Sequence, residues 1–226
     1  MPLSGILFDL DNTLVDRAQS IACLAGEMAE IYSADLGDVE IDTLTQTIRT
    51  LDGGGYGDRH TIFDRLAEDI PWQHRPHSQD LRDFWYTTFP KCTRPMAGLY
   101  EVLDELRTRA RRLGIVTNGS EASQSAKIDR LDIRDDMECV VVSESAGVSK
   151  PNPEIFALAL AELGLSASDA CFVGDHPDND IAGAEAAGLV SIWFAGARPW
   201  PEDRKPPAFQ IASLSDLIPL LDRMEE

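Results

Sequence analysis

The chain has few cysteines, little positive charge and no long apolar run, and each shortage excludes a class of protein. Four of its 226 residues are cysteine, and none belongs to a Cys-x-x-Cys pair, so a disulfide scaffold or a zinc site is not expected. No apolar stretch approaches the roughly 18 residues of a membrane-spanning helix, and no charged leader precedes an apolar segment. We therefore expect a reduced, soluble, cytoplasmic protein, with Cys139 and Cys171 as core residues beside apolar runs.

Basic residues are outnumbered by acidic ones. Lys and Arg total 20 against 39 Asp and Glu, which gives a formal net charge of -19. Such a field repels nucleic-acid backbones and anionic membrane surfaces, so neither is an expected partner. A small phosphorylated metabolite can still bind where a cation and a few hydrogen-bond donors make the local electrostatic potential positive. The sequence does not distinguish a monomer from a weak dimer.

Apolar runs and helical patterns alternate along most of the chain. The runs are continuous rather than alternating, which is typical of strands buried on both faces of a parallel sheet; they cover residues 5–8, 113–117, 139–143, 170–174 and 190–194. A helix is predicted to begin at Asn152-Pro153-Glu154 and end at Gly164, and another lies between Pro177 and Gly188. The pattern predicts an α/β fold with a doubly wound parallel-sheet (Rossmann-like) core.

Residues 17–94 interrupt this alternation. They contain no buried-strand run and are predicted to form helices at about 17–36, 39–51, 58–69 and 78–89. The aromatic residues expected in their core are Trp72, Phe84, Trp85 and Tyr86. We therefore predict two domains, a core of residues 1–16 and 95–226 and an all-helical insert of residues 17–94.

Two acidic residues, Asp9 and Asp11, follow the first predicted strand. On an extended segment, residues two apart point to the same side, so both carboxylates should lie at the sheet edge where ligands bind. Carboxylates about 4 Å apart repel by several kcal/mol, so they need a cation between them or a shared proton. The pair can thus bind a metal ion, and one carboxylate can act as the nucleophile while the other acts as the acid–base catalyst. It can equally be a solvated acidic turn in which Asn12 and Thr13 are cap residues.

The segment FDLDNTLVD, residues 8–16, resembles motif one of the haloacid-dehalogenase-like (HAD) hydrolase superfamily. The other motifs follow in the family's order: Thr117-Asn118-Gly119, Lys150-Pro151 and GDHPDND at residues 174–180. The resemblance extends from residue 5 to about 194. It implies that the helical insert is a cap domain of the kind found in the phosphatase and phosphomutase branch.

The resemblance implies a role for each acidic motif residue. Asp9 would be the nucleophile and a metal ligand. Asp11 would be the general acid for the leaving oxygen and then the general base for water, with its backbone carbonyl on the metal. Asp175 would complete the protein ligands, and Asp180 would orient water or Lys150. Oxygen-only ligands suit Mg²⁺ better than zinc.

The resemblance also implies a phosphate-binding set, namely Thr117, Asn118, Gly119 and Lys150. The helix that begins at Ser120 and Glu121 would direct its positive end toward the phosphoryl oxygens. Lys150 would offset charge on the phosphoryl group and on Asp9. Other interpretations stay open, because Thr117 could simply end a strand and Lys150 could be a solvated charge. Asp178 and Asp180 could be acids at a helix start.

Several further residues are weaker candidates, and one of them, His176, lies within the motif of residues 174–180. The glycines Gly53, Gly54 and Gly55 follow no strand, so a flexible loop that faces the active site is preferred to a phosphate cradle. Substrate contacts are conceivable for Tyr56, Arg59, His60 and His176.

Taken together, the motifs predict a Mg²⁺-dependent phosphatase that hydrolyses a small phosphomonoester, a nucleotide or a sugar phosphate, through an aspartyl phosphate. Resemblance of the GYGDR run and of residues 146–151 to nucleotidases favours nucleotides. The alternatives are a phosphomutase, a haloacid dehalogenase and a phospho-accepting receiver protein. Asp11 argues against the dehalogenase, which has no leaving oxygen to protonate.

Overall fold

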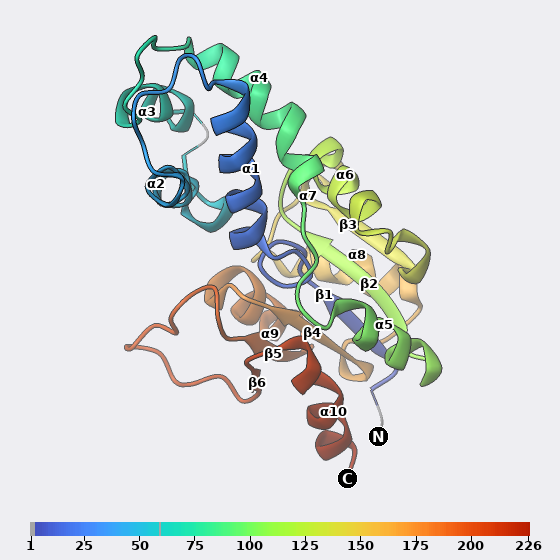
Figure 1. Cartoon of the computed structure of the whole chain (residues 1–226). Coiled ribbons are helices and arrows are strands. Elements are labelled where there is room, and N and C mark those ends of the chain that lie inside the picture. The colour runs from blue at the N-terminus through green and yellow to red at the C-terminus, as the bar shows by residue number, and fades with distance from the viewer. Residues whose placement is uncertain (1–2, 59) are drawn as a thin grey trace. The chain divides into compact units, whose positions relative to one another are not determined.

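Six parallel strands form the sheet of the larger part of the molecule (Figure 1). The computed structural model describes residues 3–58 and 60–226. The strand order is β3-β2-β1-β4-β5-β6. The strands are β1 (Gly5–Phe8), β2 (Arg112–Thr117), β3 (Cys139–Val142), β4 (Ala170–Gly174), β5 (Val190–Phe194) and β6 (Gln210–Ile211). The five predicted strands are confirmed to within one residue, and the parallel doubly wound core is confirmed with them.

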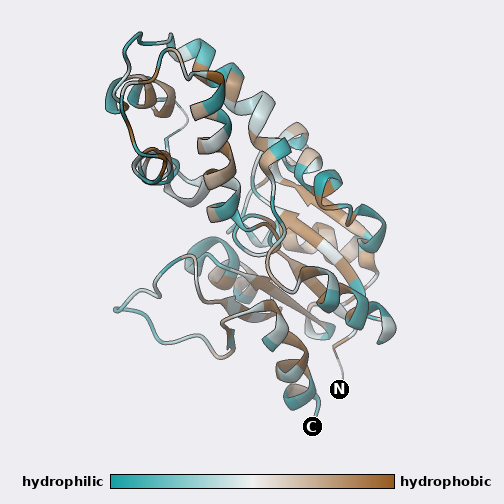
Figure 2. Ribbon diagram, in the orientation of Figure 1, coloured by the Kyte–Doolittle hydropathy of each residue, from teal (hydrophilic) through white to brown (hydrophobic). Residues whose placement is uncertain are grey.

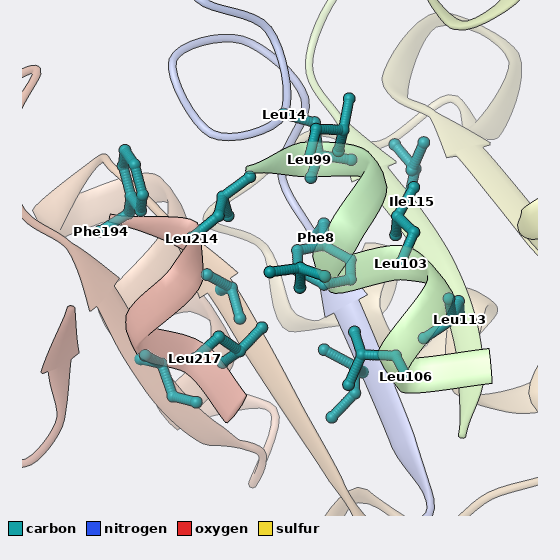
Figure 3. Close-up of a cluster of buried hydrophobic side chains, with 14 of the residues drawn as sticks. Phe8, Leu14, Leu99, Leu103, Leu106, Leu113, Ile115, Phe194, Leu214 and Leu217 are labelled. Carbon is teal, nitrogen blue, oxygen red and sulfur yellow. The ribbon is translucent and has the colours of Figure 1, made fainter. Parts of the chain in front are cut away.

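Successive side chains of a strand point to opposite faces of the sheet, and the two faces are covered by different helices. On β1, Phe8 belongs to the hydrophobic cluster of one face and Leu7 to the cluster of the other. Helices α5 (Leu99–Thr108), α6 (Glu121–Leu131) and α10 (Leu217–Glu225) cover the Phe8 face, whereas α8 (Pro153–Leu163) and α9 (Gly183–Ala186) cover the Leu7 face. Figure 3 shows Phe8 among leucines of α5 and of the C-terminal segment.

Hydropathy follows this layering. In Figure 2 the strands are coloured as hydrophobic, and hydrophilic stretches lie on the helices. The strand cysteines Cys139 and Cys171 are buried and free, as predicted. In the part of the chain that the structure describes, no helix has the length and apolar character that crossing a membrane requires.

The remaining helices of the core are short. They are α7 (Ser143–Ala146), the 3-10 turns η3 (Arg134–Asp136), η4 (Ala167–Asp169) and η6 (Leu214–Asp216), and the π-helix η5 (Pro177–Ala182). Helix α8 begins and ends where the sequence predicts. Asn152 caps it by accepting a hydrogen bond from the Glu154 amide, and Gly164 ends it in the left-handed conformation that glycine adopts without strain.

Contacts between residues divide the chain into two units, and the smaller one comprises Asp16–Arg94. Its helices are α1 (Arg17–Ile31), α2 (Ile41–Asp52), η1 (Gly53–Gly55), α3 (Ile62–Asp69), α4 (Ser78–Thr88) and η2 (Phe89–Cys92). The first helix is shorter than predicted, because the chain turns after Ile31 and Leu36 forms a bridge with Trp72. The unit has its own hydrophobic core between these helices.

The expectation that Tyr86 belongs to this core is wrong, because its side chain is 47% exposed. Phe84 and Trp85 are buried, and Trp72 packs against the same cluster. Tyr86 follows Trp85 on α4, and one residue of an α-helix turns the side chain by about 100°, which here takes the ring off the buried face. Aromatic character alone did not distinguish these neighbours.

A buried ion pair ties the start of α1 to the end of α2. Arg17 donates from Nε to Asp52 Oδ2 at 2.7 Å and from Nη2 to Asp52 Oδ1 at 2.6 Å, and both residues are buried. Asp52 Oδ2 also accepts a hydrogen bond from the Gly55 amide at 2.9 Å, and the Arg17 guanidinium lies 4.9 Å from the Phe89 ring centroid. The pair therefore fixes the glycine turn η1 within the helical unit.

Replacing Arg17 by Met should destabilise the helical unit by about 3–5 kcal/mol, because Asp52 would keep a buried charge without its guanidinium. Urea unfolding followed by circular dichroism measures the change. Arg65→Met is the matched control, since Arg65 pairs with Asp69 on the surface and its loss should cost less than about 1 kcal/mol. Equal losses in the two variants would contradict this account of the pair.

Candidate active site

Three neighbouring strands end in chemically active residues at one edge of the sheet. Asp9 follows β1, Thr117 is the last residue of β2, and Asp175 follows β4. The three strands are adjacent and parallel, so their carboxyl ends meet. The Asp9 amide donates to the Val173 carbonyl at 2.9 Å, which anchors Asp9 to β4. Open α/β sheets bind ligands at this edge, next to the strand where the winding direction changes.

Three buried carboxylates converge there. Asp9, Asp175 and Asp180 each place one oxygen within 4.8 Å of the others. Lys150 comes from the segment before α8, and its Nζ donates to Asp9 Oδ1 at 2.6 Å and to Asp180 Oδ1 at 2.7 Å. The Lys150 side chain is fully buried, and its Nζ lies 5.2 Å from the centroid of the Phe172 ring. The sequence-predicted residues Asp9, Lys150, Asp175 and Asp180 are thus brought together.

Burial and the neighbouring charges shift the pKa values of two carboxyl groups in this cluster. Burial raises the pKa of Asp9 to about 7, opposed by the Lys150 ammonium and assisted by the Asp180 carboxylate. Burial, together with the charges of Asp9 and Asp180, raises the pKa of Asp175 to about 8. Asp175 Oδ1 is buried and has no hydrogen-bond partner among the described residues. The cluster could therefore hold a metal cation on oxygen ligands.

Two contacts of Asp175 were not predicted. Arg198 Nε lies 3.3 Å from Asp175 Oδ2, and Trp193 Nε1 donates to the Asp175 carbonyl at 3.1 Å. Trp193 lies on β5, beside β4, where strand register brings it opposite Gly174. Arg198 comes from the segment after β5, where no motif or periodicity marks it.

Asp11 has a cationic partner on α6. Lys127 Nζ donates to Asp11 Oδ2 at 2.6 Å, and Gln124 Nε2 donates to the same oxygen at 3.1 Å. Both residues lie on α6 and are buried. Neither residue was predicted from the sequence. The available signal was that Gln124 and Lys127 occupy the face of the helix that also carries Ile128 and Leu131.

The residues after β2 connect the motifs to one another. Asn118 binds the backbone of Lys150 twice: its Nδ2 donates to the Lys150 carbonyl at 3.0 Å, and its Oδ1 accepts from the Lys150 amide at 2.9 Å. The Gly119 amide donates to the Ser143 hydroxyl at 3.0 Å. Thr117 Oγ1 accepts from Gln124 at 2.6 Å. Phosphate binding by Thr117, Asn118 and Gly119 stays a prediction.

The segment after β4 is built around Asp180. Its Oδ2 accepts from the His176 amide at 2.9 Å. His176 Nδ1 in turn accepts from the amides of Asp178 and Asn179, so the ring caps η5. Burial lowers the pKa of His176, which keeps it a neutral acceptor. Asp178 is exposed and pairs with Arg204, as suits an acid at a helix start.

Apart from His176, the weaker candidates belong to the helical unit. All three residues of η1, Gly53 to Gly55, have positive φ, which only glycine adopts readily. Tyr56 is exposed, and so is His60. Arg59 lies outside the described residues. Contact of this loop with substrate stays a prediction.

Comparison with known proteins identifies relatives along most of the chain. The family model of haloacid dehalogenase-like hydrolases matches residues 6–194. Glyceraldehyde 3-phosphate phosphatase of Pyrococcus abyssi is 34% identical over 193 residues, which cover 84% of this chain and 80% of that protein. Ribulose-1,5-bisphosphate 5-phosphatase of Halopiger xanaduensis is 32% identical, with 84% of each chain covered. The crystal structure of the HAD hydrolase YfnB of Bacillus subtilis, which was determined with magnesium bound, is similar to this chain with a TM-score of 0.81 and 22% sequence identity. The match covers 98% of this chain and 100% of YfnB.

Gly174 lies in close contact with the Asp180 side chain. A Cβ atom there would lie 2.5 Å from Asp180 Oδ2, so Gly174→Ala should displace the Asp180 carboxylate and cost about 1–3 kcal/mol of stability. Gly26→Ala is the control, because no atom lies within 4 Å of its added Cβ. That variant should be neutral or stabilised by up to about 1 kcal/mol, since Gly26 lies inside α1. Chemical unfolding measures both, and an unchanged Gly174→Ala protein would contradict the close contact.

Proposed function

Because the chain belongs to the haloacid dehalogenase-like hydrolase family, we propose that it is a Mg²⁺-dependent phosphatase acting on a small phosphomonoester through a phosphorylated Asp9. The observation that carries the proposal is the pairing of buried Asp9 with Lys150, 2.6 Å apart, beside Asp175 and Asp180. Relatives named as sugar-phosphate phosphatases support phosphate ester hydrolysis.

In the proposed reaction, an Asp9 oxygen attacks phosphorus while the bond from phosphorus to the ester oxygen breaks. The leaving oxygen takes a proton from Asp11, and the alcohol departs. Water then attacks the aspartyl phosphate and gives its proton to Asp11, the bond between Asp9 and phosphorus breaks, and inorganic phosphate is released. Lys150 offsets the negative charge that would otherwise oppose the approach of an anionic phosphate to Asp9.

The buried oxygens fit a magnesium ion. Asp175 Oδ1 has no hydrogen-bond partner among the described residues, and the converging ligand atoms of Asp9, Asp175 and Asp180 are all carboxylate oxygens. We assign Asp9, the Asp11 backbone carbonyl and Asp175 as ligands, with Asp180 holding Lys150. When bound, Mg²⁺ would neutralise charge and polarise the phosphoryl group. YfnB, which has the same fold, is itself magnesium-bound.

We propose sugar phosphates as the first substrates to test, ahead of nucleotides. Glyceraldehyde 3-phosphate and ribulose-1,5-bisphosphate are the substrates in the names of two relatives that share 34% and 32% identity with this chain. We also propose that the helical unit, residues 16–94, is a cap that selects the substrate. Asp11 favours phosphate chemistry over dehalogenation, because a halide leaves without a proton donor.

The purified protein should release inorganic phosphate from a sugar phosphate with Mg²⁺, lose this activity in EDTA and regain it when Mg²⁺ is restored.

Burial raises the pKa of Asp9 to about 7 and that of Asp175 to about 8. Both carboxyls therefore become protonated as the pH falls through this range, and protons compete with the metal. The half-saturating Mg²⁺ concentration should rise as pH is lowered from about 8 to about 6.

A panel of sugar phosphates and nucleotides, assayed for phosphate release, identifies the substrate class. Full activity after exhaustive chelation would exclude the metal role.

Asp9 and Asp11 are distinguished by a matched pair of amide variants. Asp9→Asn should abolish turnover, because an amide does not form the acyl phosphate. Asp11→Asn should retain the nucleophile and slow turnover by roughly 10²–10⁴-fold through loss of acid–base assistance. Phosphate release and mass spectrometry of the acid-quenched enzyme measure the two effects. Near wild-type turnover of Asp9→Asn would show that the nucleophile is misassigned.

A further inference from the structure

A buried polar network on α6 connects Asp11 to Thr117. Lys127 Nζ donates to Asp11 Oδ2 at 2.6 Å and to Gln124 Oε1 at 2.8 Å. Gln124 Nε2 donates to Asp11 Oδ2 at 3.1 Å and to Thr117 Oγ1 at 2.6 Å. Lys127 is 3% exposed and Gln124 2% exposed, so a network of this kind loses stability wherever a member is unsatisfied.

The chemistry of these groups fixes which way the Gln124 amide faces. An ammonium group only donates hydrogen bonds, so the oxygen of the amide must face Lys127. The Asp11 carboxylate accepts, so the amide nitrogen must face Asp11, and its second hydrogen is directed to Thr117. Thr117 therefore accepts from Gln124, and the hydroxyl hydrogen of Thr117 is left to donate elsewhere.

The backbone before α6 makes room for this arrangement. Gly119 has φ 149°, and a Cβ atom there would lie 3.0 Å from both Cγ and Cδ of Gln124. The Ser120 hydroxyl caps the helix by accepting from the Ser123 amide, which sets the turn on which Gln124 lies. Further along the same face, Ile128 and Leu131 pack into the core and anchor the helix.

We propose that Gln124 and Lys127 are positioning residues for the proposed phosphatase reaction, on which this inference rests: they hold the Asp11 carboxylate in place and orient the Thr117 hydroxyl to donate to the phosphoryl group. Acid–base and phosphate-binding groups act efficiently only when held within a fraction of an ångström of the productive geometry. One amide that bonds to both groups couples their positions. A buried pair kept only for stability would be replaceable by apolar residues of similar volume.

Two variants separate the two parts of the network. Lys127→Met removes the ammonium that holds Asp11 while keeping the length of the side chain. Gln124→Glu is nearly isosteric but has no donor for Thr117, so the Thr117 hydroxyl would turn and donate to the new carboxylate. Arg130→Met, an exposed position on the same helix, is the control and should match the wild type in all assays.

Lys127→Met should lower kcat for a sugar phosphate by roughly 10- to 100-fold with KM nearly unchanged, because the acid–base group is displaced while phosphate binding persists. An aryl phosphate with a good leaving group needs no acid in the first step. With that substrate the variant should show a burst of phenol equal to the enzyme concentration, as the aspartyl phosphate accumulates. Gln124→Glu should slow both substrates, because Thr117 contacts the phosphoryl group of each.

The outcomes distinguish the inference from the function on which it rests. If Asp9→Asn retains turnover, the proposed mechanism fails and this inference fails with it. If Asp9→Asn is inactive but Lys127→Met slows both substrates equally without a burst, the proposed function stands and the inference is overturned. Unfolding curves identify loss of folded protein, which would lower the burst and the steady rate together. Should Lys127→Met not fold, wild-type kinetics in Gln124→Glu would overturn the inference.

Discussion

The repulsion among three buried carboxylates is the constraint on which the rest of this site depends. Asp9, Asp175 and Asp180 lie within 4.8 Å of one another and out of water. Like charges at that separation are tolerable only where positive charge or protons offset them, and burial, aided by the neighbouring carboxylates, raises the pKa values of Asp9 and Asp175. The surrounding contacts oppose it: Lys150 bridges two of the carboxylates, and Arg198 approaches the third.

The doubly wound topology supplies positive charge to the two motif-one carboxylates from different layers. Lys150 precedes α8, which covers the Leu7 face of the sheet, whereas Lys127 lies on α6, which covers the Phe8 face. Lys127 lies 2.6 Å from Asp11, and Lys150 lies 2.6 Å from Asp9. Asp9 is buried beside other carboxylates, while the Asp11 side chain is 18% exposed.

How much of this could be predicted depends on whether the signal is local in sequence. The five long strands were predicted because each is a continuous apolar run, and α8 because Asn152 and Gly164 mark its ends. The two-residue strand β6 is too short to show a pattern. Motif spacing located the four clustered residues at the sheet edge, but roles in binding and catalysis are not visible in the geometry alone. Gln124, Lys127 and Arg198 were missed because their partners lie far away in the sequence, and only folding brings them together.

The acidic net charge of the protein is compatible with an anionic substrate, because the field of the whole protein and the contacts in the site act over different distances. With a formal net charge of -19, the protein repels anions in general. At physiological salt this field is screened within about 8–10 Å, so a small phosphate ester experiences chiefly the groups nearest to it. An extended polyanion would span many such lengths and meet the acidic surface throughout. Near the sheet edge, Lys127, Lys150 and Arg198 are turned inward onto carboxylates. Their charge offsets that of the carboxylates, which lowers the repulsion that a phosphate dianion meets beside Asp9 in the proposed reaction, and the proposed magnesium ion would lower it further.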